Sequence, residues 1–131
     1  MDRDAIEQLY AEFAWAIDAN HFELLGEVFA EQATMTLEIA GMDNPVGVFE
    51  GRAAIIEFIS GAVTEQTDVR RHVITNVRTE GDDVATATLS LFVTENGELE
   101  VRTTGVYRCR LGEEAGALRF TSMHTALDRG F

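Results

Sequence analysis

The sequence has 131 residues and a formal net charge of −13, with 23 acidic residues against 10 basic ones. A chain of this length folds as one domain, residues 1–131, and can bury roughly two thirds of its unfolded surface in a single core. A surface with this charge repels phosphate backbones and anionic membranes, so the sequence argues against nucleic-acid and membrane partners. The content of 46% hydrophobic and 25% charged residues is typical of a globular protein.

The N-terminal residues MDRDAIEQ are acidic and amphipathic, without the basic start and apolar block of a signal peptide. No apolar run approaches the roughly 18 residues of a membrane span. We therefore expect a cytoplasmic protein. The one cysteine, Cys109, cannot form an intrachain disulfide, and its place in an alternating segment predicts a buried side chain.

Residues 1–29 have the pattern of two helices. The apolar residues recur at spacings of three and four and form one stripe, at Ile6, Leu9, Tyr10, Phe13 and Ile17. This stripe stops at Asp18. Asn20 followed by Glu23 matches a capping box, which predicts a second short helix that begins near His21.

The middle of the chain predicts two short strands and a third helix. The segment ATMTLEI alternates and is rich in β-branched residues, and it leads to a turn region with the only proline. A short strand through Val48 and Phe49 follows. After Gly51, the segment RAAIIEFISGAVTEQ has apolar residues crowded on one side, as in a helix.

From Arg70 onward the period changes to two, which predicts strands near 70–80, 83–95, 98–111 and 118–126. The turns between them are EGDD, ENGE and GEEAGA, and Asn96-Gly97 is a strong hairpin signal. Four consecutive long strands predict an antiparallel meander. Helices first and strands last indicate an α+β fold, with three helices on one face of a strongly curved mixed sheet of about six strands.

His72 lies within VRRHVITNV, a segment with strand character. Successive side chains of a strand point to opposite faces, so His72 shares a face with Ile74 and Asn76, whereas Val77 points the other way. Asp18, at the end of the first helix, is the acid that could accept a hydrogen bond from one imidazole nitrogen and leave the other as an acceptor. The pair would then be a general-base dyad. The alternative is that His72 is a core histidine and Asp18 a solvated turn residue.

Other chemistry has less support in the sequence. His21 is expected to be exposed, and the three histidines are too widely separated for metal-ligand spacing. Tyr10 and Tyr107 could donate to an oxyanion, although core packing is the simpler interpretation of both. There is no GxSxG, glycine-rich phosphate loop or GxGxxG, so nucleotide and acyl-serine chemistry have little support. There is no HExxH or paired-cysteine motif either, and we expect no metal and no cofactor.

Four segments resemble one known family. They are IEQLYAEFAWAID, LLGEVFAEQATMTL, FEGRAAIIEFI and RRHVITNV followed by strands that end in LRFTSMHTALDR. Together they resemble the SnoaL-like branch of the nuclear transport factor 2 superfamily over nearly the whole chain. The resemblance implies a cone in which a curved sheet wraps a long helix around an apolar cavity, often in dimers or trimers.

Within that superfamily, the branch of scytalone dehydratase pairs an aspartate at the end of the first helix with a histidine on the first long strand. Asp18 and His72 fall on those positions. The dehydratases often have a tyrosine where this chain has Phe13, so either another group polarises the substrate carbonyl or the substrate does not need this hydroxyl. The candidates for this role are Tyr10, Tyr107 and Asn76, with Arg70 as a further donor to an oxyanion.

The resemblance implies a lyase of the dehydratase type, or a related isomerase, that acts on a small apolar or cyclic substrate. The same fold hosts ketosteroid isomerases, polyketide cyclases and ligand-binding modules without chemistry, so these remain alternatives. The catalytic residues would be His72 and Asp18. The expected substrate-binding residues are Tyr10, Phe13, Trp15, Phe49, Phe58, Ile74, Asn76, Phe92, Tyr107, Phe120 and His124. Apolar and β-branched residues on both faces of the long strands predict a homodimer or homotrimer that pairs through the outer face of the sheet.

Overall fold

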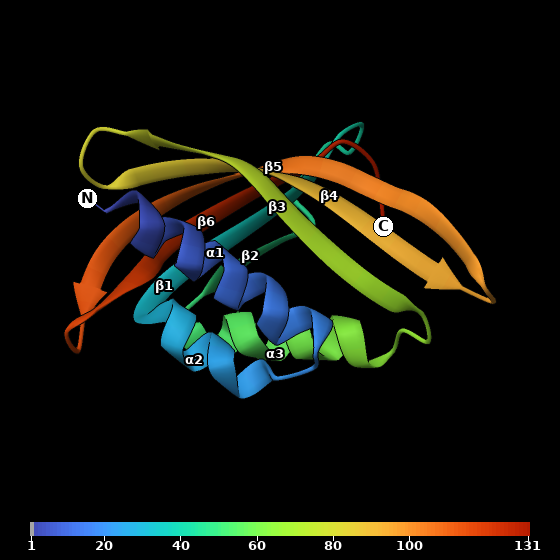
Figure 1. The fold of residues 1–131 in the computed structure, drawn as a ribbon, viewed down its shortest axis with the longest axis horizontal. Helices are drawn as coiled ribbons and strands as arrows, with labels where there is room; N and C mark the ends of the chain where they lie inside the picture. The colour runs from blue at the N-terminus through green and yellow to red at the C-terminus, as the bar shows by residue number, and fades with distance from the viewer. Residues whose placement is uncertain (1) are drawn as a thin grey trace.

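The computed structural model describes residues 2–131, with the helices on one face of a curved sheet (Figure 1). The helical elements are α1 (Arg3–Asp18), the 3-10 turn η1 (Phe22–Leu24), α2 (Leu25–Val28) and α3 (Arg52–Thr64). The strands are β1 (Phe29–Ile39), β2 (Gly47–Glu50), β3 (Val69–Glu80), β4 (Val84–Glu95), β5 (Glu98–Glu114) and β6 (Ala117–Leu127). No helix within residues 2–131 is long and apolar enough to cross a membrane.

The six strands form one sheet in the order β2-β1-β6-β5-β4-β3. The last four strands pair antiparallel in chain order, and β1 joins β6 in parallel. The predicted α+β fold with three helices on a mixed, curved sheet is therefore confirmed. The sheet does not close, so β3 and β2 are its two edges.

Helix α1 follows the predicted apolar stripe. The Asp2 carboxylate accepts from the backbone N–H of Asp4 at 2.9 Å and caps the helix, and the residues of the stripe are buried against the sheet. The predicted capping box after α1 is wrong. Asn20 has a positive φ of 57°, and η1 begins at Phe22, with His21 as its N-cap residue and no side-chain cap.

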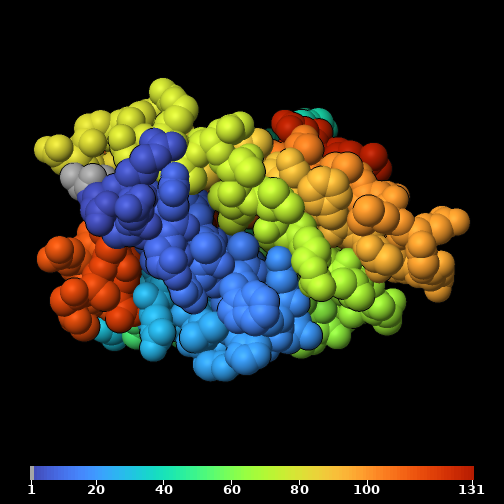
Figure 2. Space-filling model, in the orientation of Figure 1, coloured from blue at the N-terminus to red at the C-terminus, as the bar shows by residue number. Residues whose placement is uncertain are grey.

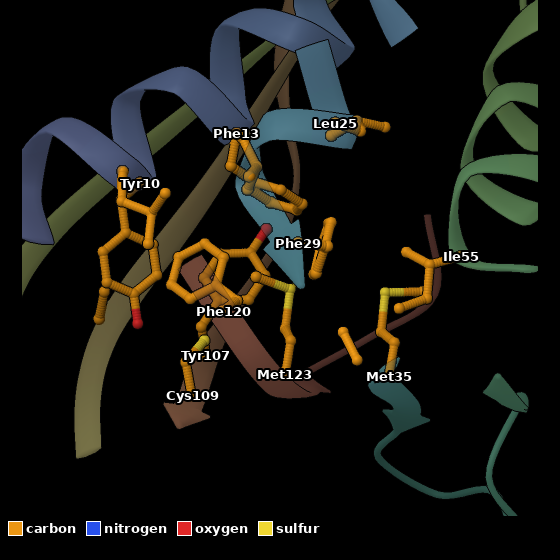
Figure 3. Close-up of a cluster of buried hydrophobic side chains, with 14 of the residues drawn as sticks. Tyr10, Phe13, Leu25, Phe29, Met35, Ile55, Tyr107, Cys109, Phe120 and Met123 are labelled. Carbon is orange, nitrogen blue, oxygen red and sulfur yellow. The ribbon is translucent and has the colours of Figure 1, made fainter. Parts of the chain in front are cut away.

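An aromatic cluster fills one end of the space between α1 and the sheet (Figure 3). Phe120 lies at its centre, with ring centroids 5.0 Å from Tyr10, 5.9 Å from Phe29 and 6.4 Å from Phe13. Edge and tilted contacts of this kind add to the stabilisation from burial itself. Phe29 starts β1 and belongs to this cluster, whereas the sequence pattern placed it on the second helix.

Strand β3 contains a bulge that the alternation of the sequence did not predict. Asn76 has a φ of 55°, and Asn76 and Val77 together oppose the single residue Ala87 of β4. The extra residue reverses the alternation, so Val77 is buried although the regular strand would have turned it away from the face of His72. Asn76 is exposed at the bulge instead of sharing the inner face.

Candidate active site

Asp18 and His72 make two hydrogen bonds with each other. The carboxylate Oδ1 lies 2.6 Å from His72 Nδ1, and Oδ2 accepts from the backbone N–H of His72 at 2.8 Å. Because β3 is an edge strand, this N–H has no neighbouring strand to bind, and the carboxylate at the end of α1 satisfies it. With Nδ1 facing a carboxylate, this nitrogen carries the proton and Nε2 is an acceptor. Each side chain is 12% exposed, so the pair is largely shielded from water.

His72 forms part of the wall of a cavity of about 110 Å³ between the sheet, α1 and α3. Most of the wall is aliphatic or aromatic. It is lined by Phe13, Ile17, Met35, Leu37, Phe58, Ile59, Ala62, Val63, Gln66, Arg70, His72, Leu89, Leu91, Thr103, Tyr107, Met123, Thr125, Leu127 and Phe131. Such a cavity holds a small apolar ligand and fixes it through a few polar groups.

Tyr107 is one of these polar groups. It is 3% exposed, and no hydrogen bond to its hydroxyl is found within residues 2–131. Burial raises the pKa of the Tyr107 phenol, and the nearby Cys109 and Asp18 add to this effect. The phenol is therefore protonated at neutral pH and can donate a hydrogen bond to a ligand.

A second hollow, of about 670 Å³, lies on the outside, between α1 and β3. Figure 2 shows these two elements side by side, dark blue and yellow-green, on the same face of the molecule. The hollow is lined by Arg3, Glu7, Tyr10, Ala11, Ala14, Trp15, Asp18, His72, Ile74, Thr75, Asn76 and Val77. Asp18 and His72 thus stand between this hollow and the inner cavity.

The structure brings some of the expected substrate-binding residues to the inner cavity. Phe13, Phe58 and Tyr107 line it together with His72. Four others line the outer hollow: Tyr10, Trp15, Ile74 and Asn76. Among these, the Trp15 side chain is 59% exposed. Trp15 points outward because it lies off the apolar stripe of α1.

The remaining expected residues lie elsewhere. Phe120 is fully buried in the aromatic cluster, and Phe49 stacks on Phe58 with ring centroids 4.2 Å apart. Phe92 alternates with the cavity residue Leu91 and so faces the other side of β4. His124 alternates with Met123 and Thr125 in the same way, and its Nε2 lies 3.0 Å from Glu38 on the outer face. Within residues 2–131, no three His, Cys, Asp or Glu side chains gather as metal ligands would.

Sequence reasoning missed several cavity residues. Met35, Leu37, Met123 and Thr125 come from β1 and β6, whose parallel pairing brings two distant segments together. Their alternation was a usable signal for the inner face. Gln66, in the connection between α3 and β3, carried no such signal.

Comparisons with solved structures place the fold among known proteins. The β subunit of a proposed aromatic-ring-hydroxylating dioxygenase from Novosphingobium aromaticivorans has a TM-score of 0.77 at 19% identity, covering 98% of this chain and 90% of that one. An NTF2-like protein with a cystatin-like fold from the same organism has a TM-score of 0.75 at 23% identity, covering 99% and 84%. A protein from Catenulispora acidiphila in complex with S-DNPA has a TM-score of 0.77 at 23% identity, covering 95% and 91%.

A search of curated proteins finds no match. The model of the SnoaL-like domain matches residues 1–124, which is nearly the whole chain. The resemblance in the sequence is thereby confirmed, together with the cystatin-like or NTF2-like fold that it implies. The chain belongs to the SnoaL-like domain family.

Proposed function

We propose that the protein is a small-molecule lyase, of the type that eliminates water, or a related isomerase, with Asp18 and His72 as a general-base dyad. The observation that carries this proposal is the double contact between the Asp18 carboxylate and His72 at the wall of an apolar cavity. It holds the imidazole in one tautomer, with Nε2 available as a base. The carboxylate would stabilise the imidazolium that forms when this nitrogen takes a proton.

In the elimination, His72 Nε2 takes a proton from the carbon next to a substrate carbonyl. The electron pair of the C–H bond forms a C=C bond, and the carbonyl becomes an enolate. The enolate then reforms the carbonyl and expels the hydroxyl group at the β-carbon, which leaves as water with the proton returned by the imidazolium. Side chains alone supply this acid–base chemistry.

The enolate oxygen needs hydrogen-bond donors. The Tyr107 phenol lines the cavity beside Phe13, the residue that stands where the dehydratases often have a tyrosine. Arg70 lines it too, two residues before His72 on β3. Asn76, a third candidate from the sequence, lies outside the cavity on the bulge. We therefore assign the stabilisation of the oxyanion to Tyr107, with Arg70 as the second donor.

The test is turnover of a panel of small β-hydroxy carbonyl compounds by wild type and two variants. Asp18→Asn should lower kcat by on the order of a hundredfold, because an amide cannot stabilise the imidazolium, and His72→Ala should abolish most of the activity. Asp128→Asn is the matched control, since Asp128 is exposed, accepts from the Thr104 hydroxyl at 2.7 Å and is not part of the cavity wall. Full activity of folded Asp18→Asn would exclude the dyad. Folding is checked by circular dichroism, because one unmatched partner of a buried pair also destabilises a protein.

A ligand-binding module without chemistry is the second candidate. It is favoured by the related protein of the same fold that forms a complex with S-DNPA. This function predicts the same cavity and saturable binding of small molecules, but no product from any of them. Mass spectrometry of a ligand that copurifies with the protein, followed by incubation with that compound, separates the two candidates.

We also propose that two chains pair through the outer face of the sheet. The exposed apolar residues on this face and their exposed fractions are Val69 (50%), Val73 (40%), Leu99 (70%), Val101 (51%) and Val106 (47%). Several exposed apolar side chains on one face of a sheet favour contact with another surface. Light scattering should give a dimer at micromolar concentration, and Val101→Glu should yield a monomer, whereas Met42→Glu, in the exposed turn after β1, should not. A monomeric wild type would exclude the pairing.

A further inference from the structure

Arg70 and Asp68 form an ion pair that is more deeply buried than the other ion pairs of the described residues. Their side chains are 9% and 5% exposed, with Arg70 Nε 3.0 Å from Asp68 Oδ1 and Nη2 3.4 Å from Oδ2. Burying two charges is costly, so such a pair is weak evidence of stabilisation. Its effect is to hold the guanidinium in one orientation at the cavity wall.

Only some N–H donors of the Arg70 guanidinium have an acceptor. The Asp68 carboxylate accepts the N–H of Nε and one N–H of Nη2, and no other acceptor for this side chain is found within residues 2–131. The ring of Phe131 lies 5.8 Å from the guanidinium carbon and covers one face of it. The remaining N–H groups, including both on Nη1, are therefore available to a ligand in the cavity.

Gln66 supplies a hydrogen-bond acceptor, which complements the donors of Arg70. Its Oε1 is buried and has no hydrogen-bond partner within residues 2–131, and it is the sole buried side-chain atom of this kind there. An unsatisfied buried amide oxygen destabilises the folded state, so its retention needs an explanation. Gln66 and Arg70 line both the inner cavity and a surface hollow of about 200 Å³ beside Asp68 and Asp18. Both residues therefore border the inner cavity as well as this surface hollow.

We propose that Gln66 and Arg70 form a polar subsite that selects neutral hydroxycarbonyl compounds. The ligand carbonyl accepts a hydrogen bond from Arg70, and the ligand hydroxyl donates one to Gln66 Oε1. The subsite rests on the proposed function, because it assumes that the substrate enters the cavity beside His72. It deepens that function by naming the substrate class and by adding Gln66 as a residue that determines specificity.

Charge and size restrict the ligand further. Asp68 cancels the charge of Arg70, and Asp18, in contact with His72, adds a negative charge next to the cavity, so a carboxylate ligand would meet no net positive field. The cavity of about 110 Å³ is somewhat smaller than the roughly 150 Å³ that admits benzene in an engineered core. A short chain fits this space, a single six-membered ring is at its upper limit, and a larger ligand requires the wall to move.

Binding of three probes to the full chain tests the subsite: 2-hydroxycyclohexanone, cyclohexanone and cyclohexanecarboxylate. The hydroxyketone has no hydroxyl β to its carbonyl, so it cannot undergo the proposed elimination, and its affinity is measured by NMR titration without turnover. Wild type should bind it about tenfold more tightly than cyclohexanone, the effect of one well-formed buried hydrogen bond, and should not bind the carboxylate.

The variants assign the effect to the residues. Gln66→Leu should fold at least as stably as wild type, lose the preference for the hydroxyketone and bind cyclohexanone unchanged. Gln32→Leu, an exposed glutamine of β1, is the matched control and should keep the preference. The double variant Asp68→Leu with Arg70→Met removes both charges together and should weaken the binding of both ketones.

The outcomes separate this subsite from the proposed function. Equal affinity of wild type for the two ketones, a preference that survives in Gln66→Leu, or no saturable binding of either ketone would each overturn the subsite. A preference lost in His72→Ala but kept in Gln66→Leu would assign recognition to His72 and overturn it as well. If the preference depends on Gln66 but no β-hydroxy carbonyl compound is turned over, the subsite holds and the lyase proposal fails.

Discussion

The space between α1 and the sheet is packed solid at one end and hollow at the other, although α1, β4 and β5 border both ends. At the packed end, Tyr10 and Phe13 of α1 meet Phe120 and Phe29 over the small residues of β4. At the hollow end, α1 presents Ile17, and α3 leaves a cavity of about 110 Å³. Phe13 and Tyr107 belong to both ends and form the boundary between them.

The two ends also differ in their polar groups. At the packed end, Tyr10 donates to the backbone of Ala85 at 3.4 Å, and the aromatic rings fill the remaining volume. At the hollow end, Asp18, His72, Gln66 and Arg70 gather around the cavity. A protein interior gains most of its stability from close packing, so the packed end stabilises the fold and the hollow end is free to carry a site.

Truncation of an aromatic side chain at each end is the strongest test of this division. Phe120→Ala should lower the free energy of unfolding by about 3–5 kcal/mol, because Phe120 is fully buried and its removal leaves a new cavity. Phe58→Ala, at the wall of the existing cavity, should cost clearly less, since Phe58 is only partly buried. Urea unfolding monitored by circular dichroism measures both. Equal losses would show that the hollow end stabilises the fold as much as the packed end.

Filling the hollow end should separate ligand affinity from stability. Ala62→Leu adds three carbons to the cavity lining, so it should weaken ligand binding by at least tenfold while leaving the fold intact or stabilising it by about 1 kcal/mol. Ala53→Leu lies on the exposed side of the same helix and should change neither quantity by much. Titration calorimetry measures the ligand affinity, and thermal unfolding measures the stability. A filled variant with wild-type affinity would mean that ligands bind elsewhere, for example in the outer hollow.

The packed end could be predicted from the sequence more fully than the hollow end. The stripe of α1 and the alternation of the long strands identify the inward positions, and these agree with the buried residues of the structure. Asp18 and His72 were paired from their places at the end of the first helix and on a strand, with support from the family resemblance, and the structure places them in contact. Their catalytic role remains a prediction.

The remaining features depend on tertiary geometry. A bulge adds one residue without changing the composition of β3, so Asn76 and Val77 could not be assigned to faces by alternation. Trp15 was assigned to the cavity as a large apolar residue, but α1 turns it to solvent. Gln66 lies in an irregular connection, where no periodicity indicates which way a side chain points.

The smallest predicted effect is the loss of stability at high pH that comes from three buried titratable groups near the boundary of the two ends, namely Tyr10, Tyr107 and Cys109. Burial raises the pKa of the Cys109 thiol from 9.0 to about 12, and it raises the pKa values of the Tyr10 and Tyr107 phenols as well. A raised pKa means that the folded state holds the proton after the unfolded chain has released it. The stability from these groups is complete below about pH 9 and is lost as the pH rises toward about 12.

For Cys109 alone, the loss should be about 1 kcal/mol at one pH unit above the value of 9.0 in the unfolded chain. Urea unfolding at a series of pH values should therefore show a falling free energy of unfolding above about pH 9. The variant Cys109→Ala should be less stable than wild type at neutral pH, because it leaves a small cavity, but its stability should fall less steeply with pH. His124→Gln, on the outer face, should leave the alkaline slope unchanged. If wild type and Cys109→Ala have the same slope, solvent reaches the thiol, and the packed end is more open than its burial indicates.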